Sequence, residues 1–103
     1  MPTKFQIAVW RACAKIPKGR VSTYAEIAKA IGKSGAARAV GNALNQNPHA
    51  PHVPCHRVVK SDGNVGGFVH GSKKKIELLR KDGIEIEKGQ IIGFKKILIL
   101  RKK

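Results

Sequence analysis

Acidic residues are scarce in this chain, whose 103 residues include 6 Asp and Glu against 21 Lys and Arg. The resulting formal net charge of +15 exceeds what solubility needs and predicts a polyanionic partner. The sequence also lacks a long apolar run, a signal peptide, a lipidation motif and a basic amphipathic membrane helix. We therefore expect that partner to be a nucleic acid and not a membrane surface.

Cysteine is scarce as well. The two cysteines, Cys13 and Cys55, are too few for a disulfide framework. We expect an intracellular chain with reduced thiols, cytoplasmic in a prokaryote or nuclear in a eukaryote. No repeat or linker divides the sequence, which predicts a single domain over residues 1–103.

The periodicity of the apolar residues predicts a mainly α fold with a small β element. Capping residues and helix stops indicate four helices, at residues 3–16, 23–32, 36–46 and 72–81. The expected β part comprises a short extended piece at 20–22, a hairpin over 84–92 and a β-prone tail at 94–100. Cys13 falls on the apolar stripe of the first helix, so we interpret it as a core residue. In the fourth helix, Ile76 and Leu79 are expected to face inward and the run Lys73 to Lys75 to be exposed.

The second and third expected helices, joined by a short turn with a glycine, are typical of a helix-turn-helix. Small residues dominate the third helix, and Arg38 is the only long side chain near its start. Such a thin helix allows close approach to a narrow groove, for example the minor groove of DNA, while one arginine projects. The small residues equally permit tight packing between helices. Tyr24, in the first turn of the second helix, is compatible with either packing or function.

The segment 53–59, Val-Pro-Cys-His-Arg-Val-Val, places a thiol next to an imidazole. His56 can take the thiol proton, directly or through a water, and Arg57 adds positive charge that favours the thiolate of Cys55. The pair is also compatible with a buried, inert cysteine. We expect no metal at His49, His52 and this pair, because structural zinc sites bring two ligand pairs from separated segments. The glycine-rich stretch 65–71 lacks the ending of a P-loop and is interpreted as a loop that closes over a small pocket.

The residues Pro54-Cys55-His56-Arg57-Val58 resemble the active-site motif of the O6-alkylguanine-DNA alkyltransferases, or methylated-DNA–protein-cysteine methyltransferases. Three more motifs match in order, so the resemblance runs from about residue 5 to residue 83: Ser22-Thr23-Tyr24, Ala36-Ala37-Arg38-Ala39-Val40-Gly41 and Asn47-Pro48. It implies a winged-helix-like helix-turn-helix domain of the alkyltransferase C-terminal type. It also implies that the separate N-terminal domain of the family and its metal ligands are missing.

The resemblance implies direct reversal of DNA damage without a cofactor. The domain would bind the minor groove of double-stranded DNA, extrude O6-alkylguanine and transfer the alkyl group irreversibly to Cys55. In this scheme His56 is a base acting through water, Asp82 stands where the family has a glutamate that orients the histidine, and Asn47 braces the segment before the cysteine. The implied DNA-binding residues are Thr23, Tyr24, Ala36, Ala37, Arg38 and Gly41, with Arg38 filling the gap in the base stack. The implied pocket residues are Tyr24, Val58, Phe68 and Val69.

Four residues depart from the family pattern. Asp82 is one methylene shorter than glutamate, which predicts a shifted backbone or a second water in its contact with His56. Phe68 and Val69 replace a tyrosine and a serine, and His70 replaces a glycine, which bears on rate and on the alkyl groups accepted. We expect a monomer that acts once per chain. The alternative is a non-catalytic lesion-binding protein that recruits other repair factors, although the alkyltransferase-like proteins of that kind lack the cysteine.

Overall fold

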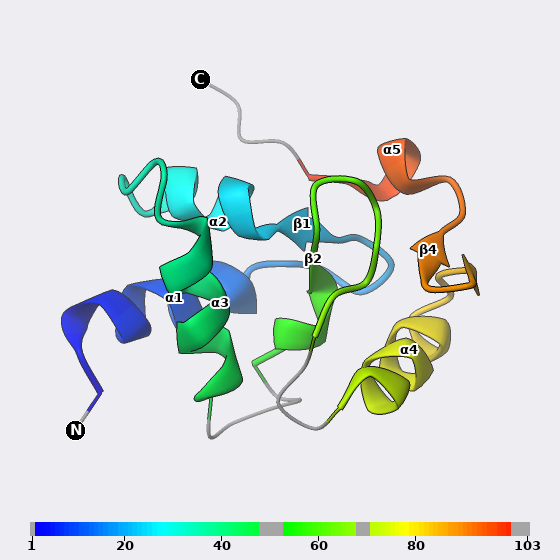
Figure 1. The fold of residues 1–103 in the computed structure, drawn as a ribbon, viewed down its shortest axis with the longest axis horizontal. Coiled ribbons are helices and arrows are strands. Elements are labelled where there is room, and N and C mark those ends of the chain that lie inside the picture. Colours follow the sequence, from blue (N-terminus) through cyan, green and yellow to red (C-terminus); the bar gives the residue numbers. More distant parts are fainter. Residues whose placement is uncertain (1, 48–52, 68–70, 100–103) are drawn as a thin grey trace.

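Three helices pack together at one end of the molecule: α1 (Lys4–Ala14), α2 (Tyr24–Ala30) and α3 (Ala37–Asn45) (Figure 1). The computed structural model describes residues 2–47, 53–67 and 71–99. The helix α3 packs against both α1 and α2, and the short connection between α2 and α3 completes the predicted helix-turn-helix. The mainly α fold class is therefore confirmed.

The middle of the molecule is a two-stranded parallel sheet. The strand β1 (Ser22–Thr23) pairs with β2 (Val58–Val59), with Ser22 opposite Val58 and Thr23 opposite Val59. A single 3-10 turn, η1 (Cys55–Arg57), leads directly into β2. The cysteine segment is thus tied to the start of the helix-turn-helix, because β1 runs straight into α2 (Figure 1).

The other end of the molecule consists of α4 (Ser72–Lys81), the antiparallel hairpin of β3 (Ile86–Glu87) and β4 (Gln90–Ile91), and α5 (Phe94–Ile97) (Figure 1). The predicted fourth helix and hairpin are confirmed. Among the described residues, no helix has the length and apolar character needed to cross a bilayer.

Side-chain caps explain where the first two helices begin. The Thr3 hydroxyl accepts a hydrogen bond from the Gln6 amide at 3.0 Å, and the Gln6 side chain accepts from the Thr3 amide at 2.9 Å. This is the predicted capping box. At α2 the Thr23 hydroxyl accepts from the Glu26 amide at 3.1 Å. Each cap satisfies an amide that has no partner inside its helix.

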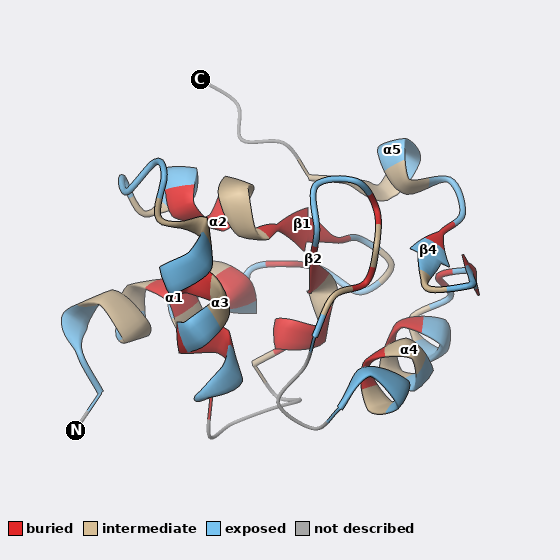
Figure 2. Cartoon of the chain, in the orientation of Figure 1, coloured by how far each residue is buried: buried red, intermediate tan, exposed pale blue. Residues whose placement is uncertain are grey.

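The core has two parts, and β2 contributes one residue to each. Figure 2 shows buried segments in α1, α3, β2 and α4. Alternate residues of a strand point to opposite sides, so Val58 packs in the first part and Val59 in the second. The first part comprises Val9, Cys13, Ile16, Ile27, Ala28, Val40, Ala43, Leu44, Cys55 and Val58. The second comprises Val21, Val59, Val65, Leu79, Ile84, Ile86 and Ile91. Cys13 is 0% exposed, which confirms its interpretation as a core residue.

Two sequence expectations were wrong. The tail was expected to be extended, but residues 94–97 form α5, and only the following Leu98 pairs with Val21. Packing decides this, because Phe94 and Ile97 lie against the second part of the core. In α4, Lys75 was expected to be exposed and is 0% exposed, while Leu79 faces inward as predicted and Ile76 is half-buried.

Candidate active site

The cysteine segment is held in place by main-chain and side-chain hydrogen bonds. The Cys55 amide donates to the Val53 carbonyl at 2.8 Å, and the Asn47 side-chain amide donates to the same carbonyl at 3.0 Å. Asn47 follows α3 closely and is 4% exposed. The end of the helix-turn-helix therefore fixes the backbone immediately before Cys55.

The thiol of Cys55 lies in the first part of the core and the residue is 3% exposed. Burial raises the pKa of Cys55 above its ordinary value, whereas a hydrogen bond from the Asn47 side chain and the positive charge of Lys75 act in the opposite direction. The thiol is thus protonated at rest at neutral pH. A nucleophilic role requires a group that removes its proton.

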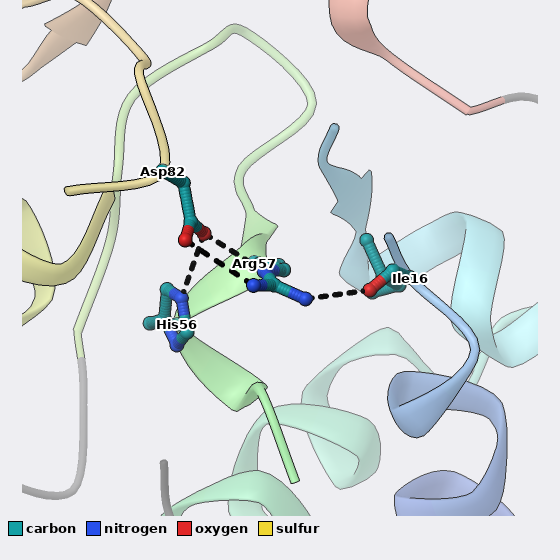
Figure 3. Close-up of polar contacts among 4 residues, drawn as sticks. All are labelled: Ile16, His56, Arg57 and Asp82. Atoms are coloured by element: carbon teal, nitrogen blue, oxygen red, sulfur yellow. Dashed lines mark hydrogen bonds and ion pairs between the residues drawn. The ribbon is translucent and has the colours of Figure 1, made fainter. Parts of the chain in front are cut away.

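His56, Arg57 and Asp82 form one network (Figure 3). His56 Nε2 lies 3.0 Å from Asp82 Oδ2, and Arg57 binds both oxygens of the same carboxylate, with Nε at 2.8 Å from Oδ2 and Nη2 at 3.2 Å from Oδ1. A third guanidinium nitrogen, Nη1, donates to the carbonyl of Ile16 at 2.8 Å. Arg57 thereby connects the cysteine segment with the end of α4 and with the chain just after α1.

The network sets the protonation of the imidazole. Burial acts to raise the pKa of Asp82, but hydrogen bonds from Arg57 and His56 outweigh it and hold this pKa below its ordinary value. Burial lowers the pKa of His56 below 6.5, despite the contact with Asp82. The ring is therefore neutral at pH 7, and because a carboxylate only accepts, the ring hydrogen is on Nε2 and Nδ1 is the acceptor. The shorter Asp82 makes this contact directly, at 3.0 Å, so no second water is needed between the two side chains, while the shifted backbone stays a prediction.

Lys75 is the residue that sequence reasoning missed. Its ammonium is fully buried and donates to the carbonyls of Val58 at 2.7 Å and Gly67 at 2.9 Å, and to the hydroxyl of Tyr24 at 3.3 Å. Three acceptors match its three donors, which is what a buried ammonium requires. Burial lowers the pKa of Lys75 to about 8. A signal was present in the sequence, because Lys75 and Leu79 are four residues apart and share the inward face of α4.

The other predicted site residues occupy different environments. Arg38 is exposed near the start of α3, and a Cβ built on Gly41 would lie 3.8 Å from the ring of Tyr24, so α3 passes close to that ring. Ala36 and Ala37 are half-buried. Thr23 is 3% exposed with its hydroxyl engaged as a helix cap, and Val58 is 0% exposed.

Some sequence expectations stay open. Phe68, Val69 and His70 lie outside the described residues, as do His49 and His52. The roles assigned to all the site residues remain predictions. Within the described residues no cluster of three or more His, Cys, Asp or Glu side chains has the arrangement of a metal site.

Fold and site together define a helix-turn-helix domain built around a buried cysteine, with a neutral histidine beside it. Residues 4–84 match the family model of the DNA-binding domain of 6-O-methylguanine DNA methyltransferase. The chain therefore belongs to this family.

Relatives and solved structures show how much of the family architecture the chain contains. It is 49% identical over 81 residues to the methylated-DNA–protein-cysteine methyltransferase of Methanosarcina acetivorans, covering 79% of this chain and 52% of the relative. The Mycobacterium tuberculosis OGT in complex with DNA superposes with a TM-score of 0.77 at 46% identity, covering 80% of this chain and 51% of that one. The chain thus spans about half the length of these relatives.

A third similarity extends further along the chain. Schizosaccharomyces pombe Atl1, solved with damaged DNA containing O6-carboxymethylguanine, superposes with a TM-score of 0.85 at 31% identity. It covers 98% of this chain and 100% of Atl1. The likeness includes the hairpin and α5, which lie beyond the residues of the family model.

Proposed function

We propose that this chain repairs DNA by transferring the alkyl group of O6-alkylguanine to the sulfur of Cys55. The observation that carries the proposal is the arrangement around that sulfur. A neutral His56 oriented by Asp82 and a buried Lys75 lie in the same site as the thiol, in a domain of the methyltransferase family. The substrate is double-stranded DNA, in keeping with the net charge of +15.

DNA docking is assigned to α3. The small side chains make this helix narrow enough to approach the minor groove of B-DNA, which is only about 6 Å wide. Arg38 is exposed at its start and replaces the extruded base in the stack, which offsets part of the few kcal/mol that extrusion costs. Tyr24 lies beside α3, and its hydroxyl contacts the buried Lys75. Because its hydroxyl accepts from Lys75, the hydroxyl hydrogen points elsewhere and can be donated to the base.

The transfer exchanges one bond for another. His56 accepts the thiol proton through a water, and the sulfur then attacks the alkyl carbon. The new S–C bond forms as the C–O6 bond breaks, and the electron pair of the broken bond goes to the guanine oxygen. The Lys75 charge and the Tyr24 hydrogen bond stabilise the negative charge that develops first on sulfur and then on guanine. The product is a thioether that no neighbouring group hydrolyses, so each chain acts once.

Mass spectrometry tests this proposal. The chain is incubated with a duplex containing one O6-methylguanine, then digested and sequenced. We expect one added methyl group on Cys55, none in the Cys55→Ser variant, and full transfer in the matched Cys13→Ser variant. Methylation of Cys13, or conversion of more than one lesion per chain, would contradict it.

A second candidate is a lesion-binding protein that leaves the alkyl group on the DNA and recruits other repair factors. The match to Atl1 over nearly the whole chain favours it. This candidate predicts tight, salt-sensitive binding to the lesion duplex with Cys55 unmodified and the O6-methylguanine intact after prolonged incubation. The same digest therefore decides between the two.

A further inference from the structure

Lys60, the residue directly after β2, and the Tyr24 hydroxyl both lie beside Gly66. A Cβ built on Gly66 would be 3.1 Å from the Tyr24 hydroxyl oxygen, 3.4 Å from Cγ of Lys60 and 3.7 Å from Nζ of Lys75. Three side chains from different segments thus converge on one glycine. The backbone of Gly66 has φ +73°, a conformation that favours glycine and leaves this space open to them.

The backbone of Lys60 is fixed by a tight turn. Its amide donates to the Asn64 carbonyl at 2.9 Å, and its carbonyl accepts from the Gly63 amide at 3.0 Å. The nearby carboxylate of Asp62 accepts from the Asn64 amide at 2.9 Å within the same turn. Lys60 is exposed, and in the part of the chain that the structure describes it forms no ion pair. Its ammonium is therefore available to an outside anion.

Lys60 and Lys75 differ in what they can bind. Lys75 is fully buried, and its three donors are used by acceptors inside the protein. Lys60 has Cγ of its aliphatic stem near Gly66, the residue is exposed, and its flexible side chain leaves the charged end within reach of solvent. Near the start of α3, Arg38 is the long cationic side chain, and it is assigned to the base stack rather than to a phosphate.

We propose that Lys60 binds a backbone phosphate of the DNA strand that carries the lesion, next to the Tyr24 hydroxyl. This inference rests on the proposed function, because it takes DNA to approach along the surface that contains α3 and Tyr24. The contact anchors the strand at the turn formed by residues 60–64, in addition to the contact made by α3.

The contact has a defined electrostatic signature. A lysine that neutralises one phosphate adds about 0.9 to the slope of log K against log salt concentration. Its loss weakens binding about 3- to 10-fold at low salt for damaged and undamaged DNA alike, because a phosphate carries no base information. A residue acting on the base or on the thiol has neither effect.

The experiment compares Lys60→Gln and Lys60→Arg with the control variant Lys88→Gln. The control also removes one positive charge, but from the hairpin turn between β3 and β4, which lies at the other end of the molecule from α3 (Figure 1). All three are made in the Cys55→Ser background, so that binding to a short O6-methylguanine duplex is measured at equilibrium over a range of salt concentrations. We expect the slope to fall by about one in Lys60→Gln only, with Lys60→Arg close to the parent. With Cys55 present, the ratio of transfer from the duplex to transfer from free O6-benzylguanine base is expected to fall in Lys60→Gln.

Two outcomes overturn the assignment. One is a salt slope that is equal in Lys60→Gln and Lys88→Gln. The other is an equal loss of transfer from the duplex and from the free base, which would place Lys60 in the base pocket. Failure of the proposed function looks different, because Cys55 would then stay unmodified by every substrate while the salt slopes still report whether Lys60 binds a phosphate.

Discussion

Replacing Asp82 with asparagine is the sharpest test of the network around His56. The carboxylate accepts three hydrogen bonds, two of them on Oδ2, from His56 and from Arg57. An asparagine keeps the shape but offers only one acceptor. If its oxygen faces Nη2 of Arg57, its amide nitrogen opposes two other N–H donors. If its oxygen instead takes the place of Oδ2, it accepts from both of those donors, and its amide nitrogen opposes only Nη2 of Arg57. In either orientation at least one N–H donor of the network loses its acceptor.

The size of the effect follows from the bonds lost. Hydrogen bonds to a charged group contribute about 1.5–3 kcal/mol each, and neutral ones about 0.5–1.5 kcal/mol. Since the side chains of Asp82 and Arg57 are 8% and 17% exposed, solvent offsets only part of the loss. We expect the free energy of unfolding to fall by about 2–4 kcal/mol. The neutral amide also no longer stabilises the imidazolium that forms when His56 accepts the thiol proton, so transfer slows about 10²- to 10⁴-fold.

Urea unfolding and single-turnover transfer measure the two effects. The Asp82→Glu variant keeps the charge and is expected to retain most of the stability and rate. Asp62→Asn makes the same chemical change in an exposed turn, where we expect a loss below about 1 kcal/mol. An Asp82→Asn variant within about 1 kcal/mol of wild type, or one with an unchanged rate, would refute this account of the network.

Acid titration supplies a further check with a defined sign. The pKa of Asp82 is lowered in the folded chain from the ordinary value of 3.8. Its contribution to stability is therefore present above that value and is lost as the pH falls through the lowered folded pKa. The stability gap between wild type and Asp82→Asn is thus constant near neutral pH and narrows below about pH 4.

Three more predictions concern the remaining groups of the site. Burial lowers the pKa of Lys75 from 10.5 to about 8, so between pH 8 and 10.5 the unfolded chain binds more protons than the folded chain. As the pH rises through that window, the free energy of unfolding of wild type is therefore expected to increase by about 3 kcal/mol relative to that of Lys75→Met. Urea unfolding of both proteins at pH 7.5 and 10.5 measures this gain, and parallel curves would contradict it. Gly66→Ala combines a positive φ with a contact at 3.1 Å to the Tyr24 hydroxyl, so we expect a loss of about 1–2 kcal/mol in urea unfolding together with slower transfer. Because the pKa of His56 is lowered, the acid limb of the rate of transfer is expected below pH 6.5, and a midpoint above that value would show that a different group acts as the base.

Local chemistry made much of the fold readable from the sequence. Apolar periodicity, the capping box at Thr3 and the cap at Thr23 located the helices to within a few residues, and the glycine-containing turn identified the helix-turn-helix. The pattern of isoleucines around Lys88-Gly89 located the hairpin. These features depend on neighbours within one helical turn or one hairpin, so no distant contact is needed to specify them. The candidate chemistry of Cys55 was visible for the same reason, because the cysteine and the histidine are adjacent.

Only the tertiary structure decided which distant groups meet at the site. The lysine run predicts an exposed Lys75, yet the carbonyls of Val58 and Gly67 give its buried ammonium partners that no pattern within α4 reveals. The β-prone residues of the tail predict an extended segment, yet contacts with the second part of the core make it begin as a helix. The sequence by itself determined the first four helices, the hairpin, and the adjacent cysteine and histidine at positions 55 and 56. The pKa of each group and the reach of Lys60 come from burial and from neighbours far along the chain, and such energies exist only once the chain has folded.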